Sequence, residues 1–296
     1  YMKVLILGCN GQLGRCLIDQ LCGTNYEVIA YGKDLVDIGD LVATQDLVTV
    51  TKPYAVINAS AYTAVDTAEN DAEMANHINH IAVKNLAEIC AKQGAILVHI
   101  STDYVFDGYA ASPYMEDAQT HPLGVYGSTK LLGEQAITRV DCQHLIIRTA
   151  WLFSEYGNNF LKTMLRLGNE RDELSIVGDQ TGCPTYAQDL AKAIICALPV
   201  LKNDSSLSGL YHYCGNESCT WFDFATVIFG EAKCLGLKIP QALHSIASSD
   251  FTTLAHRPHY SVLDTHKIHE AFDVQSSDWR RSIPIILGKI VGSSSK

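Results

Sequence analysis

The chain has 296 residues, 47% of them hydrophobic, and a formal net charge of −10. This length fits one large α/β domain, or a core domain with a smaller partner. The acidic balance argues against nucleic acid as a partner, because contacts with phosphates need a basic patch. No apolar run approaches the length of a membrane span, about 20 residues, and the first run, residues 4–7, is too short for a secretory signal. We therefore expect a cytoplasmic protein with neither a membrane nor a nucleic-acid partner.

Cysteine and histidine do not form the patterns of a metal site. The ten cysteines include no Cys-x-x-Cys pair, and several lie in apolar stretches, among them Cys16, Cys22, Cys90 and Cys196. The histidine pairs spaced three apart lack a second ligand pair or a carboxylate motif. We expect reduced, buried thiols and no metal ligands.

Strand and helix patterns alternate along the first half of the chain. The expected strands are residues 4–7, 27–31, 55–57, 95–100 and 145–148. The helical patterns between them are residues 12–21, 41–50, 71–92 and a helix that begins near 125. Such alternation predicts an α/β fold with a parallel sheet and helices on both of its faces.

Three glycines follow the first expected strand. Gly8, Gly11 and Gly14 stand between that strand and a helix. Glycine permits a tight turn and the close approach of a pyrophosphate to the helix N-terminus, where unpaired N–H groups and the dipole favour an anion. The position at a strand-to-helix turn predicts a dinucleotide site.

The strand near residue 100 ends in hydroxyl side chains, Ser101 and Thr102, followed by Asp103. Active groups of open α/β sheets lie past the carboxyl ends of the strands. The alternative is that both hydroxyls merely cap a turn.

Tyr126 and Lys130 stand four residues apart at the start of a helix, so they share one helical face. An ammonium group beside a tyrosine lowers the pKa of the phenol, which suits proton transfer to or from an alcohol/ketone pair. The spacing alone also occurs on solvated helix faces, and it is the combination with the other two stretches that favours a site.

Together these motifs resemble the extended short-chain dehydrogenase/reductase family. The resemblance rests on Ser-Thr-Asp-Tyr-Val-Phe-Asp-Gly at 101–108, Tyr-Gly-Ser-Thr-Lys at 126–130, Arg-Thr-Ala-Trp at 148–151 and Gly-Asn-Asn-Phe at 157–160. It covers nearly the whole chain. It implies a Rossmann-type doubly wound parallel sheet in residues 1–150, to which about 172–200 return. A smaller C-terminal substrate-binding lobe would hold about 151–171 and 201–296, including residues 210–213.

The resemblance also implies an activity, the NAD(P)H-dependent reduction of the 4-keto group of a nucleotide sugar. The expected reaction converts dTDP-4-dehydrorhamnose to dTDP-L-rhamnose. The implied catalytic residues are Thr102, Tyr126 and Lys130, with Thr102 where much of the family has serine. The implied cofactor-binding residues are Tyr126 and Lys130 together with Gly8, Asn10, Gly11, Gln12, Leu13, Gly14, Lys33, Asp37, Ile38, Ala59, Ser60 and Ala61.

The implied substrate site lies past the same strand ends. Its expected residues are Thr102, Asp103, Tyr104, Trp151, Asn159 and Arg257. We expect the cations Lys162, Arg166 and Arg257 near a substrate diphosphate.

The second strand bears on the choice of cofactor. Family members that prefer NAD often have an acidic residue at its end, which bonds the adenosine ribose. Here Gly32 and Lys33 occupy that place, and a cation suits a 2′-phosphate. NADPH is therefore the expected cofactor, with NADH as the alternative.

Other readings stay open. The chain could be another epimerase, dehydratase or reductase of nucleotide sugars, or a non-catalytic regulatory subunit on the same fold. Regulatory relatives tend to lose the Tyr/Lys pair, which this chain keeps. The resemblance also leaves open a homodimer and a bound Mg²⁺, for which the sequence offers no ligand cluster.

Overall fold

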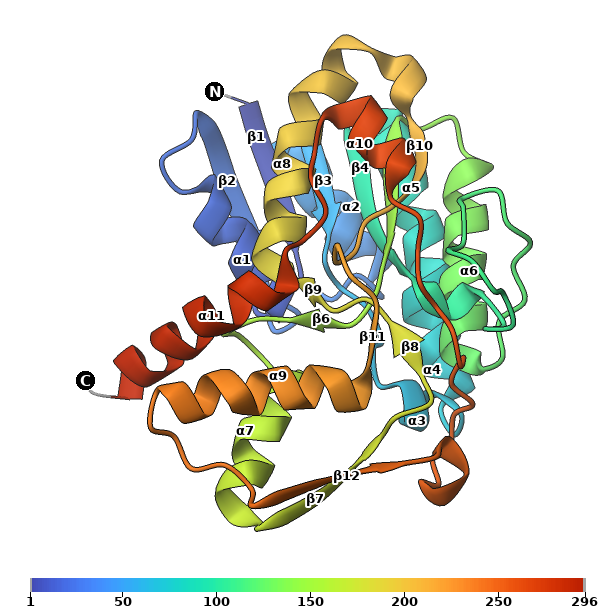
Figure 1. Ribbon diagram of the computed structural model, residues 1–296. Helices are drawn as coiled ribbons and strands as arrows, with labels where there is room; N and C mark the ends of the chain where they lie inside the picture. The colour runs from blue at the N-terminus through green and yellow to red at the C-terminus, as the bar shows by residue number, and fades with distance from the viewer. Residues whose placement is uncertain (1, 295–296) are drawn as a thin grey trace.

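A computed structural model describes residues 2–294 and contains a central sheet of six parallel strands (Figure 1). The strand order is β10-β5-β4-β3-β1-β2. The strands are β1 (Met2–Leu7), β2 (Tyr26–Tyr31), β3 (Ala55–Asn58), β4 (Ile96–Thr102), β5 (His144–Thr149) and β10 (Gly209–His212).

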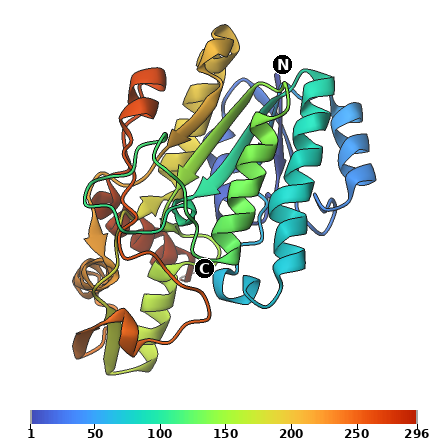
Figure 2. The same ribbon diagram turned by 90° about the vertical axis from the view of Figure 1, so that its right-hand side faces the viewer.

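Side chains that alternate along the strands fill two separate cores. Val4 and Ile6 of β1 pack in one core, and Leu5 and Leu7 in the other, because successive residues of a strand point to opposite faces. The first core is covered by α1 (Gln12–Leu21), α8 (Ala187–Asn203) and α10 (His266–Phe272). The second is covered by α2 (Leu41–Thr51), α5 (Ala82–Gln93) and α6 (Val125–Thr138), of which α5 and α6 lie side by side in Figure 2. The predicted doubly wound sheet is confirmed.

The order of the strands in the sheet switches at β1: β2 lies on one side of it, and β3 and the later strands lie on the other. That strand pairs with β2 on one side and with β3 on the other. Ligands of such sheets bind outside the carboxyl ends of the strands, at the switch point. Gly8, Asn58 and Thr102 follow or end neighbouring strands, and Thr102 stands level with Thr149 of β5, so all four meet at one edge.

A smaller lobe lies below the sheet in Figure 1. Its core joins side chains of α7 (Phe160–Glu170), α9 (Trp221–Cys234) and α11 (Trp279–Ser294) to the paired strands β7 (Glu173–Val177) and β12 (Ala242–Ile246). Short pairs connect it to the sheet domain: β6 (Leu152–Phe153) with β9 (Thr185–Tyr186), and β8 (Thr181–Gly182) with β11 (Cys219–Thr220).

Two expectations need correction. Residues 210–213 were expected in the smaller lobe, but β10 pairs with β5 in the main sheet and Tyr211 packs in its core. An amphipathic strand does not reveal which sheet edge it will join. All ten cysteines are free, yet Cys22, Cys196 and Cys234 are exposed rather than buried. Cys22 and Cys234 lie at helix ends, and Cys196 lies on the outer side of α8.

The expected helix 71–92 is interrupted. It consists of α4 (Ala72–Asn76), a π-helical turn η1 (His77–Ile81) and α5. Asn79 lies in that turn, where its side chain bonds both backbone groups of Tyr62, at 2.9 and 3.1 Å, and the hydroxyl of Thr129 at 3.2 Å. Single π-helical turns are frequent at functional sites. Through the bonds of Asn79, this turn connects the loop after β3 to helix α6. Helix α3 (Val65–Ala68) lies between that loop and α4 in the sequence.

A buried ion pair fixes α6 on the sheet. Both carboxylate oxygens of Glu134 accept bonds of 2.7 Å from the Arg148 guanidinium of β5, and their side chains are 5% and 3% exposed. Arg148 also contacts His212 at 3.3 Å and lies over the ring of Phe106. Removal of one partner from such a pair leaves an uncompensated buried charge.

Glu134→Ala should therefore lower the free energy of unfolding by about 3–5 kcal/mol, measured by urea denaturation. Glu170→Ala is the matched control, because Glu170 pairs with Arg166 on the surface and should contribute less than about 1 kcal/mol. Equal losses in the two variants would show that the buried pair does not fix α6.

Within residues 2–294 no helix is long and apolar enough to cross a bilayer.

Candidate active site

One cleft collects nearly all of the residues that the sequence singles out. It has a volume of about 1150 Å³ and opens at the carboxyl ends of the strands. Its lining includes every predicted catalytic and substrate residue, and every predicted cofactor residue except Gly14. Residues that the sequence did not single out also line it, among them Val36, Met74, Ile78 and Trp221.

The glycine loop is shaped for an anion. Gly8 has φ +79°, and a Cβ there would lie 2.7 Å from the Ser60 hydroxyl, so only glycine fits. Gly14 lies off the cleft because it packs on the loop, where a Cβ would collide with the carbonyl of Gly8. Gly11 caps α1 without a side-chain hydrogen bond, and the first turn of α1 faces the cleft. Uncapped N–H groups at this place fit a pyrophosphate.

The far end of the cleft is lined by Lys33, Asp37 and Ile38. Lys33 is exposed, and the neighbouring Asp34 accepts a 3.1 Å bond from the amide of Asn10. Asp37 accepts a 2.8 Å bond from the backbone N–H of Gly39, so its carboxylate also shapes its own turn. The ammonium of Lys33 is the cation available here to an anionic group.

Buried side chains beneath the loop after β3 hold it in place. The side-chain oxygen of Asn58 accepts a 3.1 Å bond from Ser60 N–H, and its amide nitrogen lies 3.2 Å from Nδ1 of the buried His99. Burial holds the pKa of His99 well below its usual value, so the imidazole is neutral. Ala59, Ser60 and Ala61 thus present a fixed backbone with small side chains to the cleft.

Thr102 and Tyr126 meet at the end of β4. Both side chains line the cleft, and Thr102 is near enough to Tyr126 to lower the pKa of the phenol. Thr102 also accepts a 3.1 Å bond from the N–H of Tyr104 and donates one of 3.2 Å to Asp103. The hydroxyl of Ser101, in contrast, has no hydrogen-bond partner in the described part of the chain.

The electrostatics of Tyr126 and Lys130 differ from the expectation. Burial raises the pKa of Tyr126 to about 12, and the neighbouring Thr102 side chain offsets only part of that rise. Lys130 is not among the groups that set this pKa, and its ammonium donates to the carbonyl of Ile100. Burial lowers the pKa of Lys130 to about 8, against the opposing charge of Glu134. Tyr126 is therefore a neutral phenol at neutral pH.

Asp103 is buried beside this pair. Burial raises the pKa of its carboxyl to about 7, although the side chains of Ser261 and Thr102 act in the opposite direction. A carboxyl of this kind is partly protonated near neutral pH and can then donate a hydrogen bond as well as accept one.

The wall opposite the strand ends is aromatic. Trp151 stacks on Trp221 with ring centroids 3.5 Å apart and planes 10° apart, and Phe160 lies 4.8 Å from Trp221. Trp151 has a left-handed backbone, φ +49°, which aims its ring toward the lobe. No sequence motif marked Trp221, because its place depends on how the lobe packs on the sheet.

Asn159 and the three expected cations have distinct places. Asn159 caps α7 through a 3.1 Å bond from Lys162 N–H and bonds the carbonyls of residues 154 and 156, so its side chain orders its own loop. Lys162 bonds a backbone carbonyl and Arg166 pairs with Glu170, and neither lines the cleft. Arg257 does line it.

Within residues 2–294, no group of three or more His, Cys, Asp or Glu side chains is arranged to hold a metal ion.

Comparisons with known proteins agree on one family. The family model of the RmlD substrate binding domain matches residues 2–291. The chain is 42% identical over 284 residues to a dTDP-4-dehydrorhamnose reductase of Aggregatibacter actinomycetemcomitans, covering 95% of this chain and 97% of that one.

Two crystal structures of dTDP-4-dehydrorhamnose reductases superpose with a TM-score of 0.90. The one from Bacillus anthracis, in complex with NADP, is 36% identical and covers 97% of this chain and 99% of its own. The one from Clostridium acetobutylicum is 38% identical and covers 98% and 100%. The resemblance inferred from the motifs is confirmed. The chain belongs to the RmlD substrate binding domain family, the group of extended short-chain dehydrogenase/reductases that contains the dTDP-4-dehydrorhamnose reductases.

Proposed function

We propose that this protein uses NADPH to reduce the 4-keto group of dTDP-4-dehydrorhamnose, giving dTDP-L-rhamnose. The observation that carries the proposal is the Thr102–Tyr126 pair at the mouth of a dinucleotide cleft, in a chain that matches reductases of this name over nearly its whole length. The NADP in the Bacillus anthracis structure supports the choice of cofactor.

The sheet domain holds the dinucleotide. When bound, the cofactor supplies a hydride. The first turn of α1, with Gly11, Gln12 and Leu13, binds the pyrophosphate, and Ala59 to Ala61 offer backbone on the other side. Lys33 neutralises the 2′-phosphate, while Asp37 and Ile38 border the adenine.

Tyr126 acts as the proton donor. Its raised pKa keeps the hydroxyl protonated at neutral pH, which suits a ketone that must gain a proton on oxygen as hydride adds to carbon. Thr102 donates a hydrogen bond to the same oxygen and stabilises its growing negative charge. Lys130, held by the carbonyl of Ile100, places a positive charge beneath the reacting groups.

The substrate lies between the strand ends and the smaller lobe. Asp103, Tyr104 and Trp151 border the sugar, Asn159 orders the adjacent loop, and Arg257 faces the diphosphate. We propose a similar division for the domains: residues 1–150 with α8 bind the cofactor, and the lobe binds the sugar nucleotide. Of the expected segment 172–200, β7 belongs to the lobe, because it pairs with β12 and packs in the lobe's core. Strand β10 and helix α10 also belong to the cofactor-binding domain, because they pack with its sheet.

Tyr126→Phe should lower turnover by about 10²–10⁴-fold and leave NADPH binding intact, because only the proton donor is lost. Steady-state rates and a fluorescence titration with NADPH measure the two effects. Tyr109→Phe, at a tyrosine that is 74% exposed, is the control. Full turnover in the Tyr126 variant would remove this residue from the mechanism.

Lys33→Ala should lower the ratio of kcat/KM for NADPH over NADH by about tenfold, the contribution of one charge-assisted hydrogen bond. Lys84→Ala, which removes an exposed lysine outside the cleft, should leave the ratio unchanged. An unchanged ratio in the Lys33 variant would show that another group reads the 2′-phosphate.

A reductase and an epimerase differ in their use of cofactor. A reductase consumes one NADPH for each sugar nucleotide reduced, whereas an epimerase regenerates its cofactor within each turnover. We expect loss of nicotinamide absorbance in step with loss of the 4-keto substrate, followed together in one reaction. Product formed with only traces of cofactor, and without net oxidation, would favour the epimerase.

A further inference from the structure

One carboxylate ties the smaller lobe across the cleft. Asp66 lies on α3, just after the loop that borders the cofactor end of the cleft. Its Oδ1 accepts 3.0 and 3.1 Å bonds from Ala255 N–H and Arg257 Nη1, and its Oδ2 accepts a 2.9 Å bond from Arg257 Nη2. These three bonds fix a segment that is far away in the sequence against the sheet domain.

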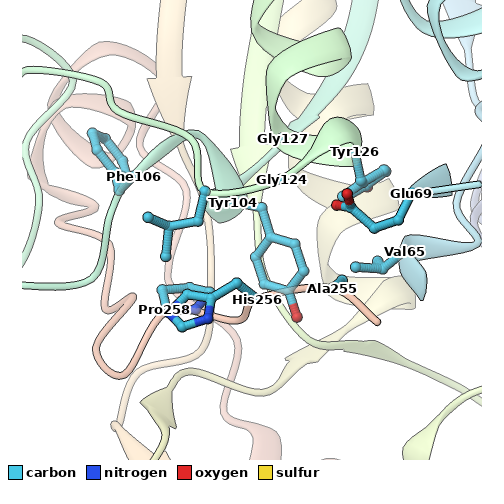
Figure 3. Close-up of a pocket in the computed structure, with 11 residues that line it drawn as sticks. Val65, Glu69, Tyr104, Phe106, Gly124, Tyr126, Gly127, Ala255, His256 and Pro258 are labelled. Carbon is cyan, nitrogen blue, oxygen red and sulfur yellow. The ribbon is translucent and has the colours of Figure 1, made fainter. Parts of the chain in front are cut away.

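The guanidinium of Arg257 lies between Asp66 and Tyr104, which is next to Tyr126. Its positive charge also acts on the Tyr104 side chain, whose pKa it lowers against the larger rise caused by burial. The ring of Tyr104 meets that of Tyr126 edge-on, with centroids 5.8 Å apart and planes at 86°. Figure 3 shows Tyr104 extending from the turn near Gly124 toward the segment that carries Ala255 and Pro258. Asp66 is therefore connected to Tyr126 through two side chains, those of Arg257 and Tyr104.

Arg257 is also one of the few positively charged residues that line the cleft. Among the described residues that line it, the lysine and arginine cations are Lys33, Lys130 and Arg257. Lys33 lies at the cofactor end of the cleft, and Lys130 lies beneath the reacting groups. Arg257 is therefore the cation in this lining that can bind an anionic substrate. A bidentate bond to Asp66 occupies two of its five N–H donors. The other donors are available to an anion.

We propose that Asp66 is a positioning residue for the reaction. It holds Arg257 so that the free donors of the guanidinium meet the substrate diphosphate and Tyr104 packs against Tyr126. This inference rests on the function proposed above. The simpler alternative is an ion pair that only ties two lobes together, and such a pair on the surface has little effect beyond stability.

The test compares Asp66→Asn, which keeps the shape of the side chain and removes its charge, with the unaltered protein. We expect KM for dTDP-4-dehydrorhamnose to rise by about tenfold or more, because Arg257 loses its charge-assisted bond to the diphosphate. The KM for NADPH should stay the same. Calorimetric titration with dTDP should show an equal rise in Kd. Glu217→Gln, at a surface pair with Arg280 outside the cleft, is the control.

A second variant separates positioning from simple attraction. Arg257→Lys keeps the charge and loses the bidentate geometry, so it should raise the same KM. Because both residues act as one unit, the double variant should be no worse than Arg257→Lys alone. Thermal unfolding establishes that each variant is folded.

The outcomes are distinguishable. If Asp66→Asn lowers only the Tm and leaves KM and the Kd for dTDP within twofold, the pair is structural and the inference is wrong. If it lowers KM, Asp66 competes with the diphosphate, which also overturns the inference. If the unaltered protein oxidises no NADPH with this substrate, the proposed function fails, while the dTDP titration still decides the role of Asp66.

Discussion

The site depends on how closely α6 packs against the sheet and the π-helical turn. At Gly133 any side chain would collide with the backbone of Asn79, so the two helices touch through their main chains. Eight residues after Tyr126, Glu134 forms the buried ion pair with Arg148 of β5. Since Tyr126, Lys130 and Glu134 follow each other at four-residue steps, one face of one helix carries the chemistry and its anchor.

That packing also sets the electrostatics. Close contact buries Lys130 and partly buries Tyr126, which lowers the pKa of the amine and raises that of the phenol. Both shifts favour neutral forms. A neutral phenol is the form that can give a proton to a ketone, so the same burial that fixes the helix prepares it for reduction.

Much of this could be predicted from the sequence, because it is encoded locally. The turn at Gly8, the hydroxyl at the end of β4 and the Tyr126/Lys130 spacing each lie within one short stretch, and the structure brings all of them to a single cleft. What escaped prediction depends on long-range packing. Trp221 stacks on Trp151 only after the lobe folds back, and Asp66 meets Arg257 across the cleft. The expectation that Lys130 lowers the pKa of Tyr126 fails because burial, which depends on the packing of α6, raises that pKa.

The most direct test of the central claim is to follow the hydride itself. The protein would be given dTDP-4-dehydrorhamnose and NADPH that carries deuterium on the transferred position of nicotinamide C4. Mass spectrometry and NMR of the product would then locate the label. The expected result is one deuterium at C4 of the sugar in every molecule of dTDP-L-rhamnose. A product without deuterium, or with the label at another carbon, would contradict a direct reduction of the 4-keto group.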